Sequence, residues 1–270
     1  MNVDKLGVGG TGQSPVHSAL SMVEGVDFHV QYHSDRTGGD FFDAVKAGSR
    51  VAFLLSDIAG RRREADPVAA ETQEVFRSRA LELLGPLDAN LADGTAVLVQ
   101  AVNLALMGAG KHIRFAPTFV GCYDVQLGVL AYINAGGQTA AIRDRDGTRA
   151  LPNVTMPLGL FTHLTYEPSM QAFEPGARLL VVTKGVTQSM REGAEFGADR
   201  VMEVLKNSGD GSAAEVCKTV LESAREFEKL SWGKRWFRKD DAQEDMTALA
   251  LVRTESGILP TSVSQEPFRY

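Results

Sequence analysis

Residues 51–60 read VAFLLSDIAG, in which five apolar side chains lead into Ser56 and Asp57 and then into a turn that contains glycine. An unbroken apolar run of this length, ended by turn residues, is typical of a strand that is buried on both faces. The aspartate at its end then lies at the edge of a sheet, where carboxylates from other strand ends can converge. The stretch therefore predicts a layered β structure with Asp57 at a functional edge.

Two further aspartates occupy comparable positions. Asp40 follows two glycines, and Asp245 directly precedes the apolar strand pattern of residues 247–252. Each aspartate alone would be interpreted as a turn or capping residue. Mg²⁺ and Mn²⁺ take oxygen ligands, so converging carboxylates and one backbone carbonyl suffice to hold them. The set of Asp40, Asp57 and Asp245 therefore favours a metal site over three unrelated turns.

The elements on either side of this stretch indicate an α+β fold. Apolar residues recur at alternate positions in the strand segments and at three- or four-residue spacing in the helical ones. Because strands and helices come in groups, a layered domain is favoured over regular βαβ alternation. The strands between residues 118 and 151 are expected to form a meander. The expected strands are 26–32, 51–55, 118–123, 129–134, 140–144, 149–151, 179–183 and 247–252, and the expected helices are 67–84, 95–107, 198–206 and 213–229.

Composition restricts the environment and the partners. Lys and Arg number 28 against 34 Asp and Glu, a net charge of −6, so no general attraction to nucleic acid is expected. The two cysteines provide no disulfide framework, which fits a cytoplasmic protein, and no membrane span is expected. We expect a flexible N-terminal arm (1–25), one domain (26–253) and a C-terminal tail (254–270).

Six short blocks resemble, in order, the signature segments of PPM-type (type 2C-like) metal-dependent protein phosphatases of the bacterial SpoIIE-like branch. No block is specific alone, but six in the family's order cover most of the chain between residues 26 and 252. The blocks are GGDFFD (38–43), SDIAG (56–60), NAGG (134–137), PLGL (157–160), TKGVT (183–187) and DMT (245–247).

The resemblance implies a β-sandwich flanked by helical layers, with Mg²⁺ or Mn²⁺ at one end and phosphoserine or phosphothreonine as substrate. By residue, it implies that Asp57 bridges two ions and Ile58 contributes a backbone carbonyl. Asp40 corresponds to a ligand of the second ion and Asp245 to a ligand of the first, which makes Asp40 and Asp57 the catalytic carboxylates. Asp43 matches a block position to which no role is assigned.

Three departures from the family pattern fall around this site. Lys184 stands where the family has a metal-binding aspartate, Gly60-Arg61-Arg62 replaces a G-H-G stretch, and Gly137 replaces a histidine. An aspartate-to-lysine change adds two positive charges, which equals the charge of one divalent ion. We therefore expect one ion rather than two, held by Asp40, Asp57 and the Ile58 carbonyl. Lys184 is expected to occupy the first-ion position and to pair with Asp57 and Asp245.

The arginines that follow Asp57 allow two interpretations. Arg61 and Arg62 are candidates for bidentate phosphate binding, because guanidinium groups match phosphate geometry. Consecutive arginines are more often part of a solvated loop. The stretch 229–239, in which basic residues alternate with Trp and Phe, is a candidate partner surface or a loop packed on the preceding helix.

Three functional hypotheses follow. The first is a serine/threonine protein phosphatase that acts on a phosphorylated protein and is weakened by Lys184. The second is a catalytically silent pseudophosphatase that binds a phosphoprotein or a signalling partner, which Lys184, Arg61 and Gly137 favour. The third interprets GGDF as the loop of a nucleotide cyclase, but it leaves Asp57 and Asp245 unexplained.

Overall fold

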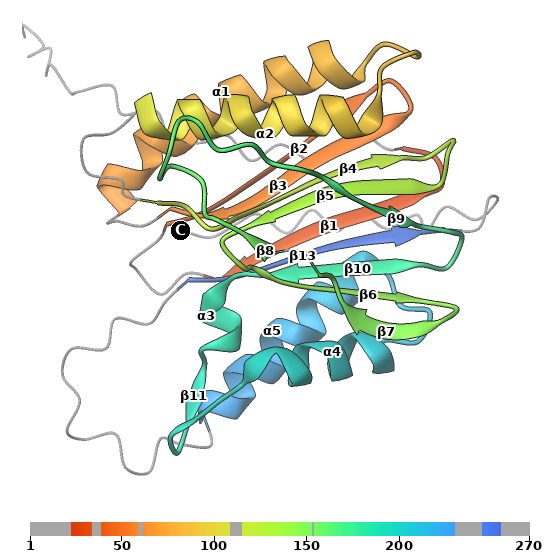
Figure 1. Ribbon diagram of the computed structural model, residues 1–270. Coiled ribbons are helices and arrows are strands. Elements are labelled where there is room, and N and C mark those ends of the chain that lie inside the picture. Colours follow the sequence, from red (N-terminus) through yellow and green to blue (C-terminus); the bar gives the residue numbers. More distant parts are fainter. Residues whose placement is uncertain are drawn as a thin grey trace, which may run out of the picture.

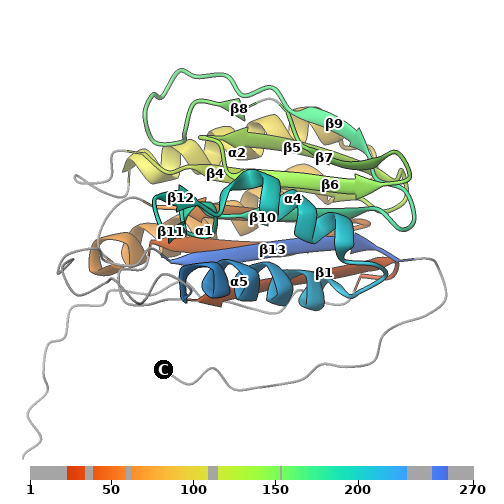
Figure 2. The ribbon, with the colours of Figure 1, turned by 90° about the horizontal axis from the view of Figure 1, so that it is seen from below.

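The computed structural model describes residues 23–33, 39–58, 62–108, 115–152, 154–229 and 245–254, with the side chains of 62–64 excepted. Two β-sheets are stacked face to face, and a pair of long helices covers the outer face of each (Figures 1 and 2). This four-layer arrangement confirms the predicted α+β sandwich with helical flanks.

The first sheet has the order β2-β3-β4-β5-β8, and β9 pairs with the first part of β5, on the edge whose last two residues pair with β8. Its pairings are antiparallel except for the short parallel contact between β5 and β8. The run quoted above lies in β3, which is buried along nearly its whole length as predicted. The strands are β2 Asp40–Ala47, β3 Arg50–Asp57, β4 Thr118–Asp124, β5 Val129–Ala135, β8 Val154–Thr155 and β9 Ser169–Ala172.

The second sheet has the order β1-β13-β10-β6-β7 and is antiparallel throughout. Its last strand in sequence, β13, lies between the edge strand β1 and β10, so the first and last strands of the domain pair with each other at one side of this sheet (Figure 2). The strands are β1 Val26–His33, β6 Thr139–Asp144, β7 Gly147–Ala150, β10 Arg178–Val182 and β13 Met246–Arg253.

Three apolar layers hold the sandwich together: one under each helical layer and one between the sheets. Helices α1 Arg62–Leu84 and α2 Leu91–Gly108 cover the first sheet. Helices α4 Gly197–Asn207 and α5 Ala213–Lys229 cover the second, together with the single turn α3 Lys184–Thr187. A small hairpin of β11 Met190–Arg191 and β12 Ala194–Glu195 connects α3 to α4.

The expected meander is wrong, because β5 belongs to the first sheet and β6 to the second. Alternation of apolar residues identifies strands but does not say which sheet they join. The crossing follows Gly136 and Gly137, whose positive φ angles of 97° and 78° suit glycine and turn the chain away from β5. The sequence analysis also did not predict strand β2, Asp40–Ala47. It expected only Asp40 to lie at the edge of a strand.

The outer segments of the predicted domain plan fall mostly outside the described residues, which begin at Val23 and end at Thr254. Val23 is buried between the sheets and forms a bridge with Val26, so the folded part begins slightly before residue 26. Residues 1–22, 230–244 and 255–270 lie outside the described residues, and with them all of the basic-aromatic stretch 229–239 except Lys229.

One helix within the described ranges, α2, is long and apolar enough to cross a membrane by length and composition. Half of that stretch is buried inside the fold. Its buried residues include Gly94, Thr95 and Asn103, and its apolar face contributes to the core beneath the first helical layer. The apolar composition of α2 is therefore explained by its packing in the core.

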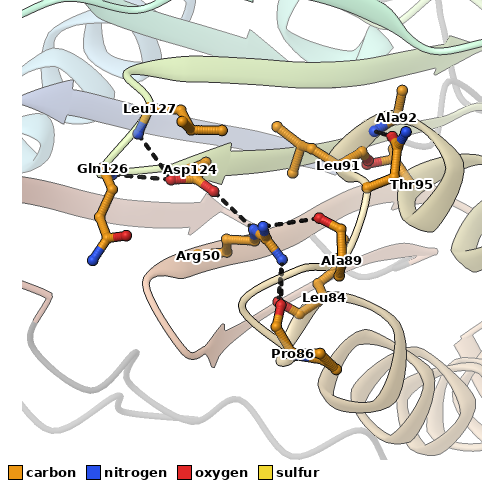
Figure 3. Close-up of polar contacts among 11 residues, drawn as sticks. Arg50, Leu84, Pro86, Ala89, Leu91, Ala92, Thr95, Asp124, Gln126 and Leu127 are labelled. Carbon is orange, nitrogen blue, oxygen red and sulfur yellow. Dashed lines mark hydrogen bonds and ion pairs between the residues drawn. The ribbon is translucent and has the colours of Figure 1, made fainter.

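A buried arginine connects the first sheet to its helices at the end of β3 that lies away from Asp57 (Figure 3). Arg50 Nε lies 2.8 Å from Asp124 Oδ2, and both side chains are almost fully buried. The guanidinium also donates to three backbone carbonyls at and after the end of α1, those of Leu84, Pro86 and Ala89. The last carbonyls of a helix lack helical partners, and Arg50 binds one of them, that of Leu84, together with two carbonyls of the loop that follows.

Replacing Arg50 with methionine is therefore expected to lower the free energy of unfolding by about 3 kcal/mol, because Asp124 is left as a buried, unpaired charge. Urea unfolding measures the change. As a control, Arg145 forms an exposed pair with Glu174, and Arg145→Met should cost less than about 0.5 kcal/mol. Equal small effects at both positions would contradict the role given to Arg50.

Candidate metal centre

The first two aspartates are brought together by the pairing of β2 with β3. Asp40 and Asp57 are directly opposite each other in the register. The chain after Asp57 is fixed from two sides, because Asp57 N donates to Pro117 O at 2.9 Å and Ile58 N donates to Gly39 O at 2.9 Å. The strand pairing thus places both carboxylates at one end of the sandwich.

Gly39 is required at this place by close approach of the backbone. A Cβ there would lie 2.3 Å from Ile58 O and 3.8 Å from Asp57 Oδ1, so any side chain would collide with the Ile58 carbonyl. The absence of a side chain on Gly39 therefore lets the backbone of the GGD block pack directly against the Ile58 carbonyl and close to Asp57 Oδ1. Both oxygen atoms belong to the predicted ligand set.

Asp40 also connects the two sheets. Its Oδ2 accepts hydrogen bonds from Thr247 Oγ1 at 2.6 Å and from Thr183 Oγ1 at 2.8 Å, and both threonines belong to the second-sheet side of the sandwich. Thr183 N donates to Thr247 O, and Thr247 N donates to Thr183 Oγ1, so the two residues hold each other. One carboxylate oxygen of β2 thus joins the ends of β10 and β13.

Burial raises the pKa of Asp40 well above its usual value, because a charged carboxylate is poorly solvated there. The negative charges of Asp57 and Asp245 raise this pKa further, while the two threonine hydroxyls oppose the shift by stabilising the carboxylate. The register pair of Asp40 and Asp57, together with the hydrogen bond from Gly39 N to Asp245 Oδ2, places the three aspartates at the same end of the sandwich. Their common role as metal ligands stays a prediction.

Asp245 is held by different partners. Its Oδ2 accepts hydrogen bonds from Tyr32 Oη at 2.7 Å and from Gly39 N at 3.1 Å. Its Oδ1 is buried and has no hydrogen-bond partner among the described residues. Asp245 therefore fixes the glycine beside Asp40 and leaves one acceptor oxygen unused, and an acceptor of this kind is costly to bury without a partner.

The donor chemistry fits a hard divalent cation. Asp40, Asp57 and the Ile58 carbonyl offer only oxygen atoms, which is the preference of Mg²⁺ and Mn²⁺. Within the described ranges, no group of three or more His, Cys, Asp and Glu side chains is arranged to hold a metal ion. Two carboxylates with one backbone carbonyl are consistent with that finding, so a metal at this end would depend on the Ile58 oxygen and on water.

Lys184 is half-buried and begins α3, directly after Thr183. The predicted ion pairs of Lys184 with Asp57 and Asp245 are not formed, since no ion pair within 4.0 Å in the described part of the chain includes Lys184. Asp245 does not need an ammonium partner for its Oδ2, because that oxygen is already bound by Tyr32 and Gly39. The occupation of a metal position by Lys184 stays a prediction.

The predicted phosphate-binding arginines lie at the boundary of the described residues. Arg61 lies outside them, and Arg62 is described only as the first residue of α1. Asp43 has a structural role that the sequence did not indicate. It is buried and forms a bidentate pair with Arg77 of α1, with distances of 2.6 and 2.8 Å, which ties β2 to the helix above it.

Sequence reasoning also missed the residues that hold the carboxylates. Thr183 and Thr247 lay inside two quoted blocks, but no role was given to their hydroxyls. Tyr32 was interpreted only as part of an alternating strand. The available signal was proximity in sequence, because each threonine lies within two residues of a candidate metal position, Lys184 or Asp245.

Two stacked, mainly antiparallel sheets lie between helical pairs, and carboxylates meet where β3 ends and β13 begins. This is the fold of the PP2C, or PPM, class of protein phosphatases. Within that class the chain belongs to the SpoIIE family, since the family model "Stage II sporulation protein E (SpoIIE)" matches residues 47–254.

A curated relative, protein IcfG of Synechocystis sp., is 34% identical over 192 residues, which cover 62% of this chain. The match covers 30% of that relative, so the chain spans less than a third of its length. Among solved structures, the RsbU and RsbW domains of Rv1364c from Mycobacterium tuberculosis align with a TM-score of 0.67 and 19% identity, covering 92% of this chain and 64% of that one. The SiaA-PP2C domain of Pseudomonas aeruginosa aligns with a TM-score of 0.65 and 16% identity, covering 84% and 86%.

Metals occur in two further structures of the same fold. The catalytic domain of the phosphatase PstP was solved with two manganese ions, and it aligns with a TM-score of 0.57 and 12% identity over 85% of this chain. RsbX was solved with magnesium, with a TM-score of 0.55 and 12% identity over 84% of this chain.

The electrostatics of Asp40 lead to a stability prediction. Since its folded-state pKa is raised, its stabilising contribution is complete below the unfolded pKa and is lost as pH rises through the folded pKa. Where Asp40 is charged in the folded protein, its desolvated carboxylate opposes folding unless a cation compensates it. We expect Asp40→Asn to raise the free energy of unfolding in EDTA at pH 7, with a smaller gain at pH 5, where the protonated carboxyl is favoured.

Guanidinium unfolding at both pH values measures this gain. Asp43→Asn is the matched control, and it should be destabilising because Asp43 is paired with Arg77. A loss of stability in Asp40→Asn at pH 7, comparable to that of Asp43→Asn, would contradict the electrostatic account.

Proposed function

We propose that this chain is a metal-dependent protein serine/threonine phosphatase whose turnover is lowered by Lys184. The observation that carries the proposal is the placement of Asp40 directly opposite Asp57, with the Ile58 carbonyl packed against Gly39 beside them. Membership of the SpoIIE family and the metal-bearing structures of the same fold support the choice of Mg²⁺ or Mn²⁺.

The chain's own residues provide positioning and electrostatics. Asp40 and Asp57 supply negative charge from neighbouring strands, and the Ile58 carbonyl adds a neutral oxygen ligand. Thr183 and Thr247 fix the direction of the Asp40 carboxylate. A bound Mg²⁺ or Mn²⁺ would supply the chemistry that the side chains lack, which is a water with a lowered pKa and a Lewis acid for the phosphoryl oxygens.

Lys184 sets the expected number of ions. Lys184 directly follows Thr183, whose hydroxyl is bound to Asp40. In the family's pattern this position carries a metal-binding aspartate, so the lysine removes a ligand and adds a positive charge that repels a cation. At short range and in a partly desolvated site, this repulsion disfavours a second divalent ion. We therefore propose one ion, held by Asp40, Asp57 and the Ile58 carbonyl.

The proposed substrates are phosphoserine or phosphothreonine residues of a signalling protein. The similar structures include a cell-fate determinant of Bacillus subtilis and a chain of the bacterial stressosome, both in regulatory systems. The partial coverage of IcfG and of the Rv1364c chain indicates that such domains occur beside others in those proteins. The net charge of −6 gives no general attraction to nucleic acid.

A second candidate is a pseudophosphatase that binds a phosphoprotein without hydrolysing it. It is favoured by the two hydroxyls already on Asp40 Oδ2 and by Lys184. An ammonium can bind phosphate, but it does not lower the pKa of a neighbouring water as a metal does. The two candidates differ in whether Mn²⁺-dependent turnover exists at all.

The activity prediction concerns Lys184→Asp. We expect weak hydrolysis of p-nitrophenyl phosphate by the natural sequence and about 10²-fold faster Mn²⁺-dependent turnover in the variant, if a second ion supplies about 3 kcal/mol of transition-state stabilisation. Lys218→Asp is the matched control, because it makes the same charge change at an exposed position of α5. Natural turnover at the rate of ordinary members of the class, unchanged by Lys184→Asp, would contradict the role of Lys184.

The binding prediction concerns the number of ions. Calorimetric titration with Mn²⁺ is expected to show one site in the natural sequence and two in Lys184→Asp. Asp57→Asn should abolish the single site, because one of its two carboxylates is removed. Two equivalent tight sites in the natural sequence would exclude the proposed effect of Lys184, and no binding to any form would favour the pseudophosphatase.

A further inference from the structure

The turn at the crossing between the two sheets is closed by a pair of amides. Asn134 Oδ1 accepts from Gln138 N at 2.9 Å, and Asn134 Nδ2 donates to Gln138 O at 2.7 Å. The three residues between them include Gly136 and Gly137, both with positive φ. A Cβ on Gly136 would lie 2.8 Å from Pro117 Cα, so the turn packs directly against Pro117.

The closed turn places the side chain of Gln138 against the backbone of Pro117, which lies next to Asp57. Gln138 Nε2 donates to Pro117 O at 3.0 Å. The same carbonyl accepts from Asp57 N at 2.9 Å. Pro117 O therefore lies between Gln138 and the backbone of Asp57, just beyond the last register pair of β3 with β4.

The burial of Gln138 indicates that its side-chain N–H group has a structural role as a hydrogen-bond donor. The residue is 2% exposed, and its Oε1 is buried with no hydrogen-bond partner in the described part of the chain. The amide orientation is decided by Pro117 O, which requires an N–H opposite it. An apolar side chain of the same length would fill the space without burying an unpaired oxygen, so the N–H donor distinguishes glutamine from a space-filling residue.

We infer that Gln138 is a positioning residue, which holds the Asp57 carboxylate and the Ile58 carbonyl in place through Pro117 O. The inference deepens the proposed function and rests on it for the metal, but the hydrogen bonds themselves are independent of any ion. The residue lies at the point where the chain passes from β5 to β6, so it links the sheet crossing to the ligand strand. Side chains that orient metal ligands in this way typically change metal affinity 10–100-fold when they are removed.

The test is Gln138→Met, which keeps the length of the side chain and removes the donor. Hydrogen exchange of the Asp57 amide, followed by NMR in metal-free protein, should become at least about tenfold faster relative to that of Leu54 in the middle of β3. The dissociation constant for Mn²⁺, from calorimetry, should rise about tenfold. Val220→Ala in α5 is the control, since it lowers stability from the opposite helical layer and should change neither ratio nor affinity.

Each outcome decides the proposal. Unchanged exchange at Asp57 would overturn it, and so would faster exchange with unchanged Mn²⁺ affinity, because Gln138 would then be merely structural. If the natural protein binds no Mn²⁺, the proposed function fails, and the exchange ratio alone decides whether Gln138 positions Asp57. If Gln138→Met does not fold, Asn134→Ala opens the same turn from its other side and should raise the Asp57 exchange ratio in the same direction.

Discussion

The carboxylate of Asp40 is the contact on which the arrangement of the functional end depends. It belongs to the edge strand of one sheet and accepts hydroxyl hydrogen bonds from Thr183 and Thr247 at the end of the other. Sheets packed through apolar side chains alone can slide, because the hydrophobic effect is not directional. Hydrogen bonds to one carboxylate oxygen fix the ends of β2, β10 and β13 relative to one another. The same hydrogen bonds that position the Asp40 carboxylate therefore also hold the two sheets together at this end.

This contact has an electrostatic cost. Asp40 is desolvated and lies near Asp57 and Asp245, and both effects raise its pKa. Asp245 adds a buried oxygen without a partner. Strain of this kind is typical of functional sites, where a ligand compensates what the protein alone does not. The opposite end of β3 is different, since Arg50 and Asp124 are fully paired there and join sheet and helices. One end of β3 thus carries a fully paired stabilising contact, and the other end carries the carboxylates of the candidate site.

Lys184 changes the electrostatics of the family's site without changing its framework. The framework consists of Gly39 packed against the Ile58 carbonyl, the pairing of β2 with β3, and the two threonines that bind Asp40. Within the described ranges the lysine forms no ion pair with Asp57 or Asp245. In the proposed function, its positive charge and the support that we infer Gln138 gives to Asp57 are the two features that separate a slow phosphatase from a phosphoprotein-binding module.

The sequence by itself determined the elements that have a strong local pattern and the residues that end them. The apolar run before Asp57, the amphipathic helices and the ordered blocks sufficed for the layered fold and for the convergence of three aspartates. Only the tertiary structure decided that β5 and β6 belong to different sheets, that Asp43 pairs with Arg77, and that Thr183, Thr247 and Gln138 hold the ligands. The physical reason is range. Periodicity reports which face of an element is buried, whereas these contacts join residues 21 to 207 positions apart, and no local pattern encodes them.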